Sequence, residues 1–287
     1  MPDPIQEIGA LQQAWLQSLF SGYQSPEELL KIGITMEAAA IHHSLLYESG
    51  RPGAAVAPTP GLNGAALTSY AGQIPFRNPA AGKKSKLAKV SASATVIGQL
   101  LICDRLWHNS GYTITTTTEE LTTHPGLPAR CQPVAGNSDS DPDANGDGVM
   151  CAIEVSTATT NAGAITNTTL NYTDVANGAG RTGTIASFPA TAAKGTFVPF
   201  QLAAGDRGVK SIQGLTKGTS YAAGVIHLVQ YRVLARISLN VANVGAVLNA
   251  LELGLPRMYD NTVPFLVWLP TATTAITLSG EMLVAHV

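Results

Sequence analysis

The chain is poor in charged residues, which make up 13% of its 287 residues. That fraction is roughly half the usual share of about 25%. Aromatic residues are only 6%, and the formal net charge is −2. Charges of both signs normally keep a free protein separate from its neighbours, so a surface this poor in charge is unusual for a monomer. One interpretation is a surface rich in Thr, Ser and Asn; the other is that much of the surface is buried against other subunits.

Several classes of protein are disfavoured by what the sequence lacks. Lys and Arg total 17 against 19 Asp and Glu, so no basic excess supports nucleic-acid binding. No apolar run is long enough to span a bilayer, and the first nine residues do not resemble a secretory signal. The three cysteines, Cys103, Cys131 and Cys151, form no C-x-x-C pattern. We expect Cys103 and Cys151 to be buried thiols, because both lie in apolar runs.

Three short helices are predicted at the start of the chain. The first covers Ile5 to Ser21, whose apolar residues follow helical spacing and form one face. These residues are Ile5, Ile8, Leu11, Trp15, Leu16, Leu19 and Phe20. A second helix is predicted from Ser25 to Gly33, with Ser25 as N-cap, and a third from Thr35 to Leu46. Such short helices are not stable alone in water, so they must dock on another surface.

An extended arm is predicted to follow these helices. Residues 48–90 are rich in Pro, Gly and Ala, include an extended piece around Phe76, and contain a basic run at residues 83–89. A loop this long argues against a compact domain. We therefore expect residues 1–93 to be an anchoring arm of short helices and extended segments laid over a neighbouring surface. Its partner interface would consist of Ile5, Ile8, Leu11, Trp15, Leu19, Phe20 and Phe76.

From residue 94 to 287 the sequence predicts an antiparallel β-sandwich, so the fold class is mainly β. A buried strand begins near Thr95 and is followed, after a polar corner, by a half-exposed strand at residues 112–115. Further strands are separated by turns rich in Gly, Asn and Asp. They are expected at residues 148–157, 164–173, 182–188, 196–202, 208–215, 224–239, 262–269 and 275–287. Residues 242–253 are the exception, because Val244, Val247, Leu248 and Leu251 have helical spacing.

The strand at residues 224–239 is the most informative of these. Both of its alternating faces begin with apolar residues, which indicates a central strand covered on two sides. Arg232 and Arg236 share one face near its end. They either pair with acidic residues across an interface or are solvated.

Four segments of the chain resemble a widespread group of tailed-bacteriophage structural proteins encoded among head genes. The segments are residues 106–111, 153–163, 197–206 and 254–260, and the likeness extends from about Ile74 to the C-terminus. The chain departs from the group at residues 122–143, an additional polar and acidic loop that contains Cys131. No site in that loop is carried over from the group.

The resemblance implies a virion component, and more specifically a capsid cement or decoration protein with a jelly-roll-like β-sandwich. Its partners would be the major capsid protein and two further copies of itself, since local threefold axes of a capsid suit a homotrimer. Its place would be the surface of the phage head. We therefore expect binding and no catalysis. We expect no nucleic-acid or membrane partner, for the reasons of composition given above, and no cofactor other than a possible Ca²⁺ ion.

One acidic loop has a metal-like pattern. Asp141, Asp143, Asn145 and Asp147 place oxygens at alternate positions, with Gly146 where the loop must turn, as in a calcium-binding EF-hand loop. The expected Glu at position twelve is missing: Ala152 stands there and Glu154 comes two residues late. The alternatives are a Ca²⁺ site at these four residues and a solvated hairpin loop, for which Asn-Gly-Asp-Gly is suitable turn chemistry.

No enzyme motif emerges from the chain. Asp104, His108 and Ser110 are local neighbours, but sequence proximity does not make a catalytic triad, and there is no G-x-S-x-G elbow. A glycan-active enzyme on a β scaffold remains an alternative without a supporting motif. A second alternative is a head-spike or tail-tip protein that binds a receptor through exposed tyrosines such as Tyr112, Tyr221 or Tyr259.

Overall fold

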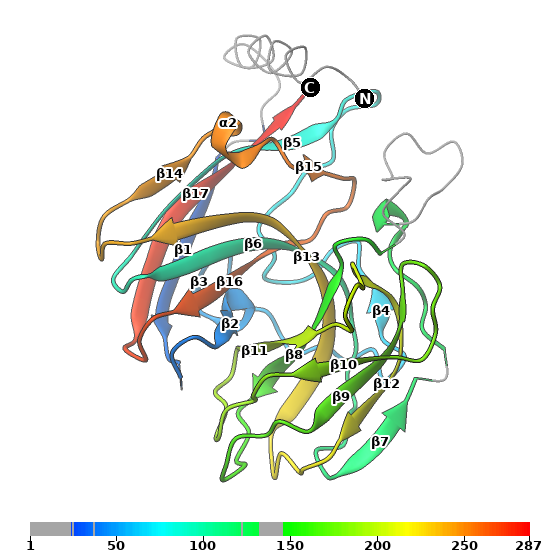
Figure 1. Ribbon diagram of the computed structural model, residues 1–287. Helices are drawn as coiled ribbons and strands as arrows, with labels where there is room; N and C mark the ends of the chain where they lie inside the picture. The colour runs from blue at the N-terminus through cyan, green and yellow to red at the C-terminus, as the bar shows by residue number, and fades with distance from the viewer. Residues whose placement is uncertain (1–23, 25, 37, 122, 132–145) are drawn as a thin grey trace.

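The computed structural model describes residues 24, 26–36, 38–121, 123–131 and 146–287. The expected mainly β, antiparallel architecture is confirmed, and the strands fall into two sheets. The smaller sheet has six strands (Figure 1). Its order is β14 (Ala246–Leu248), β5 (Ser85–Ala94), β17 (Ile276–His286), β1 (Glu27–Ile34) and β3 (Gly50–Arg51), with β15 (Arg257–Met258) also paired to β5.

The larger sheet has eleven strands and closes on itself over part of its length. Six strands form a closed barrel, because the three-residue strand β2 pairs with a strand on each side. These six are β2 (His42–Ser44), β16 (Pro264–Pro270), β6 (Gly98–His108), β13 (Val225–Leu239), β8 (Met150–Thr157) and β11 (Thr196–Gln201). Beyond β11 the sheet continues as a half-barrel of β10 (Arg181–Ile185), β9 (Thr168–Asp174), β12 (Val209–Lys217) and β7 (Thr117–Glu120), and β4 (Ala65–Ala66) pairs with β6.

Strand β6 shows how alternation builds two cores at once. Leu100 and Ile102 face the six-stranded sheet, whereas Leu101 and Cys103 face the barrel interior. Successive side chains of a strand point to opposite faces, so one strand can line both cores. The long strand β13 does the same and links the half-barrel side to the six-stranded sheet (Figure 1). The prediction that residues 224–239 form a central strand covered on two sides is therefore confirmed.

The structure of residues 26–47 differs from the sequence prediction. The expected helix at residues 25–33 is wrong: Glu27–Ile34 is strand β1, paired with β17 over most of its length. The expected helix at residues 35–46 is also wrong, since this stretch contributes β2 and part of a short 3-10 helix, Leu45–Tyr47. Pairing with β17 buries Leu29 and Ile34, a gain that an isolated short helix does not offer. The basic run at residues 83–89, predicted as part of the arm, overlaps the first half of strand β5.

The described residues contain no helix long and apolar enough to cross a membrane. Cys103 and Cys151 are fully buried free thiols, as predicted, and burial raises the pKa of both.

Candidate functional site

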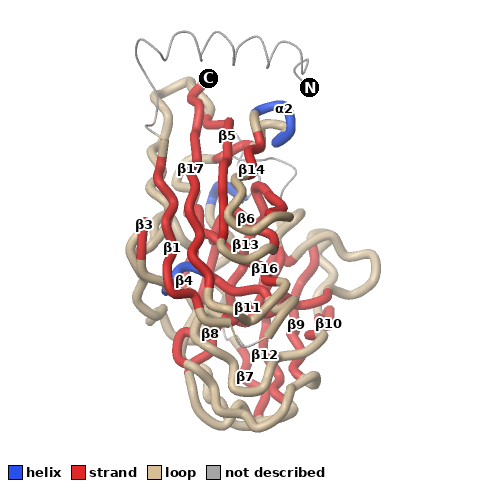
Figure 2. The backbone as a smooth tube through the Cα atoms, turned by 90° about the vertical axis from the view of Figure 1, so that its left-hand side faces the viewer, coloured by secondary structure: helices blue, strands red, loops and turns tan. Residues whose placement is uncertain are grey.

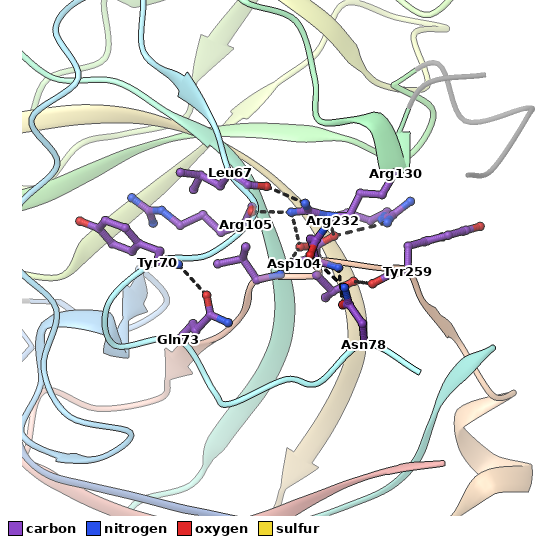
Figure 3. Close-up of polar contacts among 12 residues, drawn as sticks. Leu67, Tyr70, Gln73, Asn78, Asp104, Arg105, Arg130, Arg232 and Tyr259 are labelled. Carbon is purple, nitrogen blue, oxygen red and sulfur yellow. Dashed lines mark hydrogen bonds and ion pairs between the residues drawn. The ribbon is translucent and has the colours of Figure 1, made fainter. Parts of the chain in front are cut away.

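Two neighbouring residues of β6 carry buried charges on opposite faces of the strand. Asp104 and Arg105 are both completely buried. Arg105 points into the barrel interior, and Asp104 points outward toward Arg130 and Arg232 (Figure 3). A buried charge requires a partner, so each residue organises its own cluster.

The inner cluster is a buried ion pair between Arg105 and Glu154 of β8. Two parallel bonds join them, at 2.9 Å from Nη1 to Oε1 and 2.6 Å from Nη2 to Oε2. The hydroxyl of Tyr47 donates to Glu154 Oε2 at 2.8 Å, and Arg105 Nε donates to His108 Nδ1 at 3.1 Å. The guanidinium also lies 5.3 Å from the ring centroid of Tyr70. Every polar atom of this ion pair is therefore held by a neighbour inside the barrel.

The pKa values within the inner cluster follow from this geometry. Burial alone would raise the pKa of Glu154, but the charge and hydrogen bonds of Arg105 outweigh it and lower the pKa to about 2. Burial and the nearby Arg105 charge lower the pKa of His108 to about 3. At neutral pH the cluster thus contains one cation, one anion and a neutral imidazole that accepts from Arg105. Such a set holds strands together but offers no activated nucleophile.

The outer cluster consists of Asp104, Arg130 and Arg232. Arg130 binds Asp104 through Nη2 to Oδ1 and Nε to Oδ2, both at 2.9 Å. The backbone N–H of Val263 also donates to Oδ1 at 2.9 Å, and Arg232 Nη2 reaches Oδ2 at 3.4 Å. The Arg232 guanidinium also lies 5.2 Å from the ring centroid of Tyr259. The sequence allowed two alternatives for Arg232, an ion pair across an interface or exposure to solvent. The structure shows that it pairs with Asp104 of its own chain.

The two arginines of the outer cluster are expected to contribute unequally to stability. Replacing Arg130 with methionine should lower the free energy of unfolding by about 3 kcal/mol, because Asp104 would lose its bidentate partner while remaining buried. Replacing Arg232 with methionine should cost about 1 kcal/mol or less, because its bond to Asp104 is long and Arg130 remains. Urea denaturation of both variants measures the difference; equal losses would contradict this assignment.

The predicted calcium loop lies mostly outside the described residues, which do not include Asp141, Asp143 or Asn145. Asp147 is described, and its carboxylate lies 3.4 Å from Arg207 Nη1. Glu154 is engaged by Arg105 within the barrel. Among the described residues no group of three or more His, Cys, Asp or Glu side chains is arranged to hold a metal ion.

The predicted partner interface is likewise mostly outside the described residues, which exclude Ile5, Ile8, Leu11, Trp15, Leu19 and Phe20. Phe76 is described and is partly buried against the core under the six-stranded sheet of its own chain.

The local set Asp104, His108 and Ser110 does not form a triad. Asp104 binds Arg130 on the outer face, His108 accepts from Arg105, and the hydroxyl of Ser110 accepts from the backbone N–H of Gly61. Among the tyrosines considered for receptor binding, Tyr112 and Tyr221 are buried.

Four apolar residues in and around strand β14 are exposed at the surface. Val241, Val244, Val247 and Leu251 are 57%, 54%, 52% and 71% exposed. Residues 242–253 begin with a turn and contain strand β14 and then the short helix α2 (Ala250–Leu253), so the continuous helix expected there is wrong. Asn249 starts α2 by accepting from the backbone N–H groups of Leu251 and Glu252. We call these four exposed residues the apolar strip.

Comparisons with known proteins assign the chain to no family. No family model matches the chain, and no curated protein matches it. A chain in the structure of infectious bursal disease virus Gt strain is 8% identical, covering 93% of this chain and 82% of that one, with a TM-score of 0.14. A similarity at that level carries no argument about fold or function.

Proposed function

We propose that this chain is a structural component of a tailed-bacteriophage virion, a cement or decoration protein that binds the head lattice as a homotrimer. The observation that carries the proposal is the apolar strip, four apolar side chains each more than half exposed. Val247 lies on the edge strand β14, and the other three lie in the segments on either side of it. Exposed apolar surface of this kind marks interaction sites. The low share of charged residues and the resemblance in four sequence segments favour the same role.

In this proposal the body is related to a jelly-roll-like sandwich, and the packing of the six-stranded sheet on β6 and β13 of the barrel supports that interpretation. The apolar residues that precede Gln24 are the anchor. The major capsid protein and further copies of the chain are the partners, on the outer surface of the head. The proposed mechanism is binding without catalysis or cofactor. The buried ion pairs described above hold strands together.

Apolar burial supplies the affinity in this mechanism. Each 100 Å² of apolar surface removed from water contributes roughly 2.5 kcal/mol before ordering costs. Repetition over a lattice increases the total through avidity. A cement protein therefore needs only a modest apolar contact at each position.

Charge substitution in the apolar strip tests the proposal. Val247→Asp combined with Leu251→Asp should reduce binding to purified heads at least tenfold, because two carboxylates would be buried in an apolar contact. Val56→Asp is the matched control, since Val56 is 70% exposed and lies outside the strip. Copies per particle are counted by quantitative mass spectrometry after incubation with heads that lack the protein. Unchanged binding of the double variant contradicts the proposal.

The number of copies per particle also distinguishes a cement protein from the alternative, a head-spike or tail-tip protein. A cement protein occupies positions across the lattice, whereas a receptor-binding protein occurs only at vertices or the tail. Any truncation used in this assay must end before Gln24, because β1 and β2 are parts of the six-stranded sheet and the barrel.

A further inference from the structure

Ser156 and His227 form a further polar pair on two neighbouring strands of the barrel wall. Ser156 lies on β8 and His227 on β13, and Ser156 Oγ lies 2.6 Å from His227 Nε2. The other ring nitrogen, Nδ1, lies 2.9 Å from the backbone carbonyl oxygen of Asn109. Figure 2 shows β8 between the six-stranded sheet and the half-barrel strands β9, β12 and β7. A hydroxyl, an imidazole and a third group that orients the imidazole are the arrangement that activates a nucleophile.

The carbonyl of Asn109 determines which nitrogen of His227 carries the hydrogen. A carbonyl oxygen only accepts, so Nδ1 must donate to it. Burial lowers the pKa of His227 below its ordinary value of 6.5, so the imidazole is neutral at pH 7 and Nε2 has a free lone pair. Ser156 must therefore donate its hydroxyl hydrogen to Nε2. The proton of the hydroxyl already points at the group that would remove it.

Asn109 is itself held in place, which fixes the orientation of His227. Its side-chain Nδ2 donates to the carbonyl of Leu62 at 3.0 Å, and its Oδ1 accepts from the backbone N–H of Leu228 at 2.8 Å. In a Ser-His-Asp triad the carboxylate holds the histidine in the tautomer that can accept the serine proton. The backbone carbonyl of Asn109 holds the same tautomer here.

A β-bulge places Ser156 outside the regular pairing of β8 with β13. The register skips one residue between Thr157, which is opposite Val225, and Val155, which is opposite Ile226. Ser156 is that extra residue. Bulges redirect a side chain and are over-represented next to active sites.

Solvent access differs among the three members of the set. Ser156 is 9% exposed, whereas His227 and Asn109 are 1% and 0% exposed. The nucleophile is therefore the most accessible member, and the base and the group that orients it are shielded from water. Such limited access favours a small acyl group.

A second Ser–His contact lacks these features and provides an internal comparison. Ser85 Oγ lies 2.9 Å from His286 Nδ1, but Ser85 is 0% exposed. In the part of the chain that the structure describes, the other ring nitrogen of His286 has no hydrogen-bond partner to orient it. Proximity of a serine to a histidine alone is therefore not the basis of the inference.

We propose that Ser156 is a nucleophile for acyl transfer from small carboxylic esters, with His227 as its general base. Ser156 Oγ bonds to the acyl carbon while its proton passes to His227 Nε2, and Nε2 then protonates the leaving alkoxide as the ester C–O bond breaks. Water attacks the acyl-serine, loses a proton to Nε2, and releases the carboxylic acid as Nε2 returns a proton to Oγ. This inference goes beyond the proposed function, which requires no chemistry, and neither depends on the other.

Acetylation by p-nitrophenyl acetate tests the inference on the full-length protein. Peptide mass spectrometry should show Ser156 acetylated at least about 100-fold faster than Ser85, because a positioned general base contributes roughly 10²–10⁴-fold. His227→Gln should remove most of that difference. Release of p-nitrophenolate should exceed one per chain after subtraction of the Ser156→Ala rate, because water regenerates the serine. Ser85→Ala is the matched control and should leave both measurements unchanged.

Three outcomes overturn the inference. Acetylation of Ser156 no faster than that of Ser85 would show that the hydrogen bond to His227 only holds the strands together. An unchanged rate in His227→Gln would exclude His227 as the base. Release of one p-nitrophenolate or less per chain would exclude hydrolysis. If His227→Gln does not fold, wild-type protein in urea replaces it: selective acetylation of Ser156 must disappear on unfolding, and its persistence would contradict a role for the folded geometry.

Discussion

Replacing Glu154 with glutamine is expected to lower the free energy of unfolding by about 3–5 kcal/mol. The change removes the negative charge opposite Arg105 but keeps the size of the side chain. Both side chains are 0% exposed, so water cannot replace the lost partner. Arg105 would remain as an uncompensated cation inside the barrel, and the cost of burying it would appear in full. Urea denaturation followed by circular dichroism measures the loss.

A surface ion pair supplies the matched control. Glu28→Gln removes the ion-pair partner of Arg51. The side chains of Glu28 and Arg51 are 58% and 69% exposed. That change should cost less than about 1 kcal/mol. If Glu154→Gln and Glu28→Gln shift the unfolding midpoint equally, the inner cluster does not stabilise the barrel. Replacing both members of the buried pair, Arg105→Met with Glu154→Leu, should recover much of the loss, because no unpaired charge remains.

The strands of the second half of the chain were predictable because their signals are local. Alternating apolar residues and turns rich in Gly, Asn and Asp marked β8, β9, β10, β11, β12, β13, β16 and β17 close to their observed bounds. These elements need no knowledge of distant partners. The predicted half-exposed strand at residues 112–115 is the exception nearby, since the strand that follows β6 is β7, Thr117–Glu120.

The front of the chain was not predictable in the same way, because its structure depends on distant partners. Strand β1 reads EELLKIGI, which suits a helix locally, and it becomes a strand by pairing with β17 near the other end of the sequence. Strand β2 has three residues and closes the barrel between β16 and β11. Tertiary pairing overrides local propensity at such positions.

The buried charges show the same dependence on distant partners. Asp104 and Arg105 interrupt an apolar run, and alternation alone places them on opposite faces of β6. Their partners, Arg130 and Glu154, are 26 and 49 residues away. The sequence places both charges in an apolar run but does not show which residues neutralise them. It also singled out Val244, Val247 and Leu251 of the strip, but on an expected helix. Only the split into β14 and α2 shows that Val247 faces outward.

Several buried histidines have lowered pKa values, so acidification is expected to destabilise the protein progressively between pH 6.5 and pH 3. The largest single contribution is expected from His108. Its pKa falls from 6.5 to about 3 on folding, because it is buried and close to Arg105. In that interval the unfolded chain binds a proton that the folded chain does not, so the free energy of unfolding decreases as the pH falls. Each pKa unit corresponds to about 1.4 kcal/mol, giving an upper limit of about 5 kcal/mol at pH 3. Below pH 4.5 Glu154 acts in the same direction, since its pKa on folding is about 2.

Replacing His108 measures how much of the acid destabilisation comes from its imidazole. His108→Gln keeps an acceptor for Arg105 Nε but does not titrate, so the slope of stability against pH between 6.5 and 4 should be clearly smaller than in the wild-type protein. His286→Gln is the control, because His286 is less buried and its Nδ1 lies 2.9 Å from the hydroxyl of Ser85, away from both charge clusters. Urea unfolding at half-unit steps of pH gives the slopes. Parallel curves for His108→Gln and wild type would mean that protonation elsewhere drives acid unfolding. A reduced slope for His108→Gln alone would show that burying the neutral imidazole beside Arg105 is what acid opposes.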